Sequence, residues 1–111
     1  MTLQYAEAFK RQLKRLSRKY RRIRSDIMPI LELLNTGEYP GDQIPGTGYT
    51  LYKVRISNRD AKRGTRGGYR IIYYLQTEED VLLVAIYSKT EQSDISADEI
   101  RKILHEEESA P

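Results

Sequence analysis

Residues 81–88 (VLLVAIYS) constrain this chain more than any other segment, because seven of the eight side chains are apolar or aromatic. A short apolar run bounded by polar residues is typical of a β-strand that is buried on both faces. The polar turn before it, residues 77–80, carries three acids. The segment therefore predicts the centre of a β-sheet.

Two further strands are predicted at residues 51–57 and 69–76, where apolar and polar side chains are interleaved. The polar, Gly-containing connection between them indicates a β-hairpin with a long loop. Residues 37–50 hold four Gly and two Pro, so they are predicted to be loop. Residues 2–5 are expected to form a short first strand.

A first amphipathic helix is predicted near the N-terminus, because apolar residues recur there at steps of three and four. Nine basic residues and no acid lie between Lys10 and Arg24. These cations repel one another, so burial of the apolar stripe must offset the repulsion. The apolar stripe consists of Tyr5, Phe9, Leu13, Leu16, Tyr20, Ile23 and Ile27.

A break between two helices is predicted near Arg24. Ser25 and Asp26 are good N-cap types, and Pro29 suits the first helical turn. We therefore expect a second helix over about residues 26–36, ended by a glycine. The two helices would form an αα-hairpin packed on one side of the sheet.

A last helix is predicted after Ser96, which forms a capping box with Glu99 three residues later. The predicted order is β-α-α-β-β-β-α, an α+β fold, and residues 1–111 form a single domain. The chain lacks cysteine and has one histidine, His105, so neither a metal site nor a cofactor is expected. With no stretch of 18 apolar residues, we expect a cytoplasmic protein without membrane contact.

Charge is unevenly distributed along the chain. Residues 1–90 carry 17 Lys and Arg against 9 Asp and Glu, whereas residues 91–111 carry 2 against 7. The basic body suits a polyanionic partner. The acidic tail is either a solvated helix end or a shield for that body. Lys53 and Arg55 are two residues apart on a predicted strand, so they project from one face toward solvent, as a phosphate-binding surface requires.

Four stretches together resemble one family: YAEAFKRQLKRLSRKY, LYKVRIS, RGGYRIIYYL and VAIYSKTEQSDIS. In order and spacing they are similar to the RelE/ParE superfamily of bacterial type II toxins, and most of all to its HigB-type, RelE-like branch. The resemblance covers about residues 5–104. It implies a small twisted antiparallel sheet flanked by helices, and a ribosome-dependent mRNA endoribonuclease neutralised by a cognate antitoxin. Cleavage in this family uses the RNA's own 2′-hydroxyl and no metal.

The resemblance also implies a set of catalytic residues. Lys53 and Arg55 match paired basic residues on the second strand, Arg70 matches the arginine that opens the third, and Lys89 matches a basic position after the fourth. Some members have an arginine next, where this chain has Thr90, and a later tyrosine that the SDIS stretch lacks. Tyr87 is expected to substitute for that tyrosine.

Intramolecular RNA cleavage needs a base, an acid and charge stabilisation of the phosphorane. We expect Arg70 to stabilise the phosphorane, Lys53 and Arg55 to bind phosphate, and Tyr87 or Lys89 to move a proton. The alternative is that all five are polar strand residues in solvent, with Arg70 in an ion pair. His105 is expected to be a solvated helix-end residue.

Further RNA contacts are expected outside the catalytic set. Four basic residues of the long hairpin loop would contact ribosomal RNA backbone, or else form a solvated loop. Tyr74 would stack on a base, or else serve in packing. Two other functions stay open: a ParE-like toxin that inhibits DNA gyrase without cutting nucleic acid, and a non-toxic nucleic-acid-binding domain. The four loop residues are Arg59, Lys62, Arg63 and Arg66.

Overall fold

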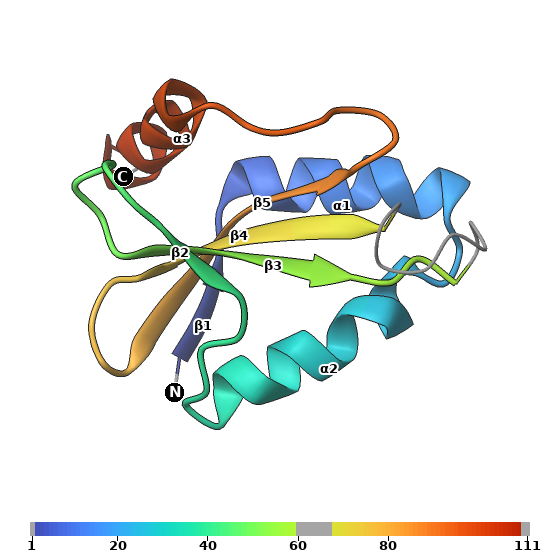
Figure 1. The fold of residues 1–111 in the computed structure, drawn as a ribbon, viewed down its shortest axis with the longest axis horizontal. Coiled ribbons are helices and arrows are strands. Elements are labelled where there is room, and N and C mark those ends of the chain that lie inside the picture. The colour runs from blue at the N-terminus through green and yellow to red at the C-terminus, as the bar shows by residue number, and fades with distance from the viewer. Residues whose placement is uncertain (1, 60–67, 110–111) are drawn as a thin grey trace.

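The computed structural model describes residues 2–59 and 68–109. Among these residues, no helix is long and apolar enough to cross a membrane. Within these described ranges, five strands and three helices follow one another in the order shown in Figure 1. They are β1 (Thr2–Tyr5), α1 (Glu7–Lys19), α2 (Ile23–Asn35), β2 (Asp42–Ile44), β3 (Leu51–Ile56), β4 (Tyr69–Leu75), β5 (Asp80–Ser88) and α3 (Ala97–Ser109).

The five strands form one sheet in the order β1-β5-β4-β3-β2. Each adjacent pair among β2, β3, β4 and β5 is antiparallel, and β1 pairs in parallel with the other edge of β5. The α+β fold is confirmed, and the sheet is mixed because β1 adds one parallel pair. The central strand is β4, so the prediction that residues 81–88 form the centre is wrong by one strand. Every β5 residue after Asp80 is nevertheless buried, because α1 and α3 both pack against this strand.

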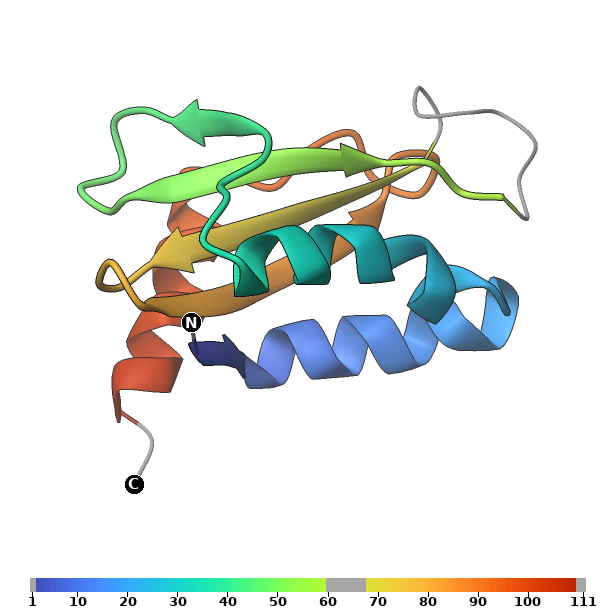
Figure 2. The ribbon, with the colours of Figure 1, turned by 90° about the horizontal axis from the view of Figure 1, so that it is seen from below.

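Helices α1 and α2 lie side by side along the sheet (Figure 2). The apolar stripe predicted for the first helix supplies the core, with Phe9, Leu16 and Ile23 almost fully buried. Tyr20 follows α1 and packs edge-on against Tyr69 of β4, with ring centroids 5.6 Å apart. The predicted packing of a helical pair on the sheet is therefore confirmed.

The start of α2 differs from the prediction. The helix begins at Ile23 rather than at about residue 26, so Ser25 and Asp26 lie inside it and Pro29 falls near its middle. Neither polar side chain caps the helix: the Ser25 hydroxyl donates to the carbonyl of Arg22, and the Asp26 carboxylate is buried. Pro29 donates no backbone hydrogen bond, and the helix continues through it because tertiary packing outweighs that loss.

A short strand, β2, lies within the segment that was predicted to be loop, and it pairs with β3 in the register Asp42 to Lys53. Gly41 allows this pairing. Its φ is +94°, and a Cβ there would lie 2.3 Å from the Lys53 carbonyl oxygen. Only glycine fits such a close backbone approach. At the other end of the chain, the Glu99 amide donates to the Ser96 hydroxyl over 3.1 Å, which confirms the predicted cap of α3.

Candidate functional site

Three candidate catalytic side chains lie in one row across the sheet. Arg70 of β4 pairs with Arg55 of β3 on one side and with Tyr87 of β5 on the other. Directly opposed residues in antiparallel strands project from the same face. Lys53 is two residues before Arg55, so it projects from that face as well. Strand alternation alone therefore gathers these four side chains.

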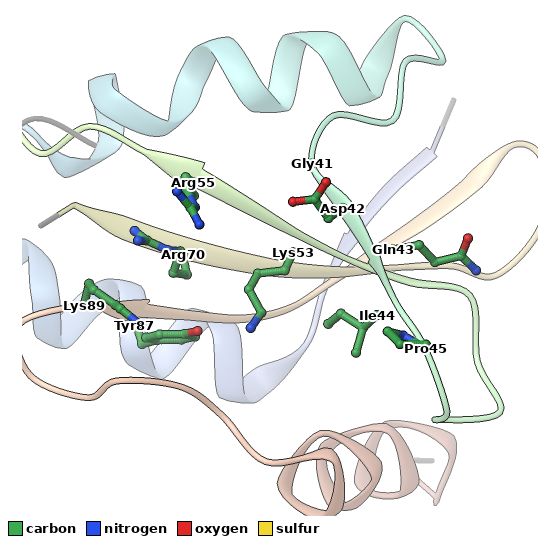
Figure 3. Close-up of a pocket in the computed structure, with 10 residues that line it drawn as sticks. All are labelled: Gly41, Asp42, Gln43, Ile44, Pro45, Lys53, Arg55, Arg70, Tyr87 and Lys89. Atoms are coloured by element: carbon green, nitrogen blue, oxygen red, sulfur yellow. The ribbon is translucent and has the colours of Figure 1, made fainter. Parts of the chain in front are cut away.

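The row borders a cleft of about 750 Å³ between β2 and the end of β5 (Figure 3). All five residues predicted to be catalytic line it, so the structure brings the whole set together. Figure 3 shows the Lys53 ammonium and the Tyr87 hydroxyl pointing toward one another across β4. The cleft is lined by Lys53, Arg55, Arg70, Tyr87 and Lys89, together with Gly41, Asp42, Gln43, Ile44 and Pro45.

Arg70 is the most buried cation of the cleft, with 5% of the residue exposed. Its Nη1 donates to the Tyr69 carbonyl over 3.2 Å. Burial lowers the pKa of Arg70, and the neighbouring Arg55 guanidinium lowers it further. Arginine nevertheless stays charged in proteins. Two adjacent guanidinium groups, one of them largely desolvated, make an environment that a phosphate would stabilise.

Asp94 joins this site from the connection between β5 and α3, and the sequence reasoning missed it. Its Oδ1 accepts hydrogen bonds from Lys53 Nζ at 2.8 Å and from the Tyr87 hydroxyl at 3.2 Å. The Lys53 hydrogen bond holds the pKa of Asp94 below its usual value. Burial, together with the charge of Asp94, raises the pKa of Tyr87 to about 12. The only available signal was the position of Asp94 within the SDIS stretch that carries the family resemblance.

Lys89 lies at the rim of the cleft, directly after β5. Its backbone amide donates to the Gly68 carbonyl over 2.9 Å, and its ammonium donates to the carbonyl of Ser93. The side chain is exposed and bends toward the connection that carries Asp94. Lys89 is thus available to a ligand without a large rearrangement.

A family model matches residues 7–108, almost the whole chain, and it describes the RelE toxin of the RelE / RelB toxin-antitoxin system. The chain belongs to the RelE toxin family. The predicted RelE/ParE resemblance is confirmed. As a member of this family, the chain is the toxin of a toxin-antitoxin system, and its partner is an antitoxin.

Arg59 of this RelE-family toxin lies outside the cleft, against α2. Its guanidinium forms an ion pair with the Asp26 carboxylate, whose side chain is 1% exposed, and donates to the Ser25 hydroxyl over 2.6 Å. The Arg59 amide also donates to Asp26 Oδ2 over 3.3 Å. The arrangement fixes the point where the chain leaves β3. Lys62, Arg63 and Arg66, the other basic residues predicted to bind RNA, lie outside the described residues.

Tyr74 of this toxin is half-buried beside another ring rather than in the cleft. Its ring packs edge-on against Tyr49, with centroids 5.3 Å apart and planes at 86°. It shares the sheet face of Arg70 but lies four residues farther along β4, where α3 covers the sheet near Leu104. The geometry favours the packing interpretation of Tyr74 over base stacking.

The basic residues of α1 and the turn after it form a second surface of the RelE-family toxin. All eight are exposed, and Arg15 and Lys19 approach Glu91 at 3.4 Å and 4.0 Å. This surface therefore lies close to the segment that follows the cleft's Lys89. His105 is exposed on α3, away from the cleft. Among residues 2–59 and 68–109, no group of three His, Asp or Glu side chains could hold a metal ion.

Proposed function

We propose that this toxin is an mRNA endoribonuclease that acts on ribosome-bound mRNA and thereby stops translation. One observation carries the proposal: five cationic or phenolic side chains, four from β3, β4 and β5 and one from directly after β5, line a single open cleft. Cationic side chains with several hydrogen-bond donors are the groups that bind a phosphodiester and stabilise charge on it.

The proposed reaction is attack of a ribose 2′-oxygen on the adjacent phosphorus. A bond forms from O2′ to phosphorus, and the bond from phosphorus to O5′ breaks. The 2′-hydroxyl loses a proton, and the leaving 5′-oxygen gains one. The chain must therefore supply a proton donor and stabilisation of the dianionic phosphorane, and the 2′-proton passes to a side chain of the cleft or to water.

Arg70 and Arg55 are suited to stabilise the negative charge of the phosphorane. Their positions on adjacent strands place two planar, permanently charged groups beside one phosphate, and each guanidinium can donate two parallel hydrogen bonds. Lys53 suits phosphate binding, because its flexible ammonium lines the cleft and carries N–H donors beyond the one that Asp94 accepts at 2.8 Å.

Tyr87 suits the proton donor. With a pKa raised to about 12, its phenol stays protonated at neutral pH, and an alkoxide leaving group is a much stronger base than a phenolate. Lys89, exposed at the rim, is the second candidate for moving a proton. The ribosome would supply the mRNA, and the exposed basic surface of α1 suits contact with ribosomal RNA backbone. Assignment to the HigB-type branch stays a prediction from the sequence.

The test is a map of mRNA 5′ ends by primer extension after induced expression. New ends inside translated frames, together with arrest of protein synthesis, are expected. Arg70→Lys should remove most of these ends, because lysine keeps the charge but loses the planar fork. Lys102→Ala, an exposed α3 residue outside the cleft, is the matched control. Continued protein synthesis with defects in DNA supercoiling would replace the proposal with gyrase inhibition.

A further inference from the structure

Asp94 is exposed to solvent, yet its carboxylate is hydrogen-bonded to three protein groups. Its side chain is 61% exposed, so water would solvate the carboxylate without any protein partner. Yet Oδ1 accepts three hydrogen bonds, from Lys53 Nζ, from the Tyr87 hydroxyl, and from the Ile95 amide at 2.8 Å. The last of these fixes the carboxylate against its own backbone. Oδ1 is therefore a defined point at the edge of the cleft.

The two cleft side chains that bond to Asp94 Oδ1 could adopt several orientations without this contact. Lys53 has a flexible four-carbon stem and is 33% exposed, and the Tyr87 hydroxyl rotates about its C–O bond. Ordering such groups before the ligand arrives reduces the entropy cost of binding and of reaching a reactive geometry. The Lys53 ammonium has three N–H donors, so it keeps donors for a phosphate while it remains bonded to Asp94. The Tyr87 phenol has a single O–H, so Asp94 holds its oxygen in place until that O–H turns to the leaving 5′-oxygen.

We propose that Asp94 is a positioning residue of the cleft, which holds the Lys53 ammonium and the Tyr87 hydroxyl together where the scissile phosphate binds. This inference rests on the proposed ribonuclease function. It assigns a role to the connection between β5 and α3, which lies outside the sheet. In this role Asp94 acts through Lys53 and Tyr87 and does not itself touch the RNA.

An alternative role for Asp94, as a group that occupies the phosphate position in the free protein, makes a different prediction. If Asp94 merely occupied the phosphate position in the free protein, its removal would free Lys53 and tighten RNA binding without slowing cleavage. A positioning role predicts slower cleavage at saturating RNA. The two roles therefore separate in a measurement of the single-turnover rate and of the affinity.

Three variants test the proposal. Asp94→Asn keeps an acceptor for the Ile95 amide but loses the charge, and Asp94→Ala loses both. Glu91→Gln is the matched control: it removes one negative charge from the same connection, at a carboxylate that approaches Arg15 rather than the cleft. Affinity is measured with a 2′-O-methylated RNA oligonucleotide, which binds but lacks the attacking hydroxyl.

Asp94→Ala should lower the single-turnover rate on ribosome-bound mRNA by about tenfold or more. Asp94→Asn should recover part of the rate, and Glu91→Gln should match the wild type. Circular dichroism checks that each variant is folded. An unchanged rate in Asp94→Ala, or tighter oligonucleotide binding with an unchanged rate, would overturn the positioning role.

A second readout does not depend on cleavage. The 13Cζ resonance of Tyr87, assigned by its loss in Tyr87→Phe, reports when the phenol ionises. In Asp94→Asn this resonance should titrate at lower pH than in the wild type, and in Glu91→Gln it should not. If the wild type fails to cut mRNA, the proposed function is wrong. If the Tyr87 titration is unchanged in Asp94→Asn, the positioning role of Asp94 is wrong, whatever the outcome of the cleavage assay.

Discussion

Arg55 and Arg70 lie directly opposite one another on β3 and β4, so two guanidinium groups share one cross-strand pair. Like charges in this position destabilise a sheet. An antiparallel ladder does not itself require a pair of cations at this position. The proposed ribonuclease function would explain the pair, because a bound phosphate would remove the repulsion between the two guanidinium groups.

Arg55→Gln should therefore stabilise the protein while impairing its activity. Relief of the repulsion is expected to raise the free energy of unfolding by about 0.5 kcal/mol, and loss of a phosphate-binding cation should lower mRNA cleavage. Urea denaturation and primer extension measure the two effects. Arg24→Gln, an exposed α2 position, controls for the change in net charge. A less stable Arg55→Gln would show that Arg55 has a structural partner.

Alkaline pH should destabilise the protein partly through Tyr87. Its folded pKa of about 12 lies above the ordinary tyrosine pKa of about 10, so the folded state holds this proton more tightly than the unfolded state. The resulting stability is fully present below about pH 10 and is lost as the pH rises toward 12. Urea denaturation between pH 9 and 12 should show a shallower decline for Tyr87→Phe than for the wild type. Parallel curves for the two proteins would contradict the raised pKa.

Variants of Arg59 should act on stability rather than on RNA binding. Arg59→Ala leaves the buried Asp26 carboxylate without its ion-pair partner, which is expected to cost about 2 kcal/mol of unfolding free energy. Replacing both residues, Arg59→Met with Asp26→Leu, should recover much of this loss. A double-mutant cycle in urea measures the coupling. A fully stable Arg59→Ala with weakened ribosome binding would instead support the predicted RNA contact.

Gly41 offers a test of the short strand beside the cleft. Gly41→Ala places a Cβ against the Lys53 carbonyl, so β2 must move away from β3. We expect a loss of about 2 kcal/mol or more in unfolding free energy, together with slower cleavage, because Lys53 belongs to the cleft. Gly37→Ala is the matched control, since its φ is +88° but no atom lies within 4 Å of the added Cβ. Its free energy of unfolding should fall by about 1 kcal/mol, from backbone strain alone.

Local patterns predicted much of the fold and the cleft. Alternation along β3, β4 and β5 determines which side chains share a face, so the convergence of Lys53, Arg55 and Arg70 followed from spacing. The cap at Ser96 followed in the same way. These features depend on residues close together in the sequence, whose geometry the backbone itself imposes.

The features that escaped prediction depend on distant partners. Helix α2 begins early because packing buries Ile23, and Asp26 is a core ion-pair partner because Arg59 reaches it. The local sequence indicates only that Asp94 precedes a helix, because its contact with Lys53 depends on the fold. Strand β2 has only three residues and no alternation that would distinguish it from loop. Each of these needs a contact that no local pattern encodes.

The parallel pairing of β1 with β5 joins residues 2–5 to residues 80–83. During synthesis, the first strand has no mate until residues 80–83 have emerged from the ribosome, and β4 is open on one edge until β5 follows it. Domains whose contacts span such separations assemble late. A nascent chain that stops before β5 lacks the strand that joins β1 to β4, and it also lacks Tyr87, so a cell making this toxin is exposed to the proposed activity only after β5 has been translated.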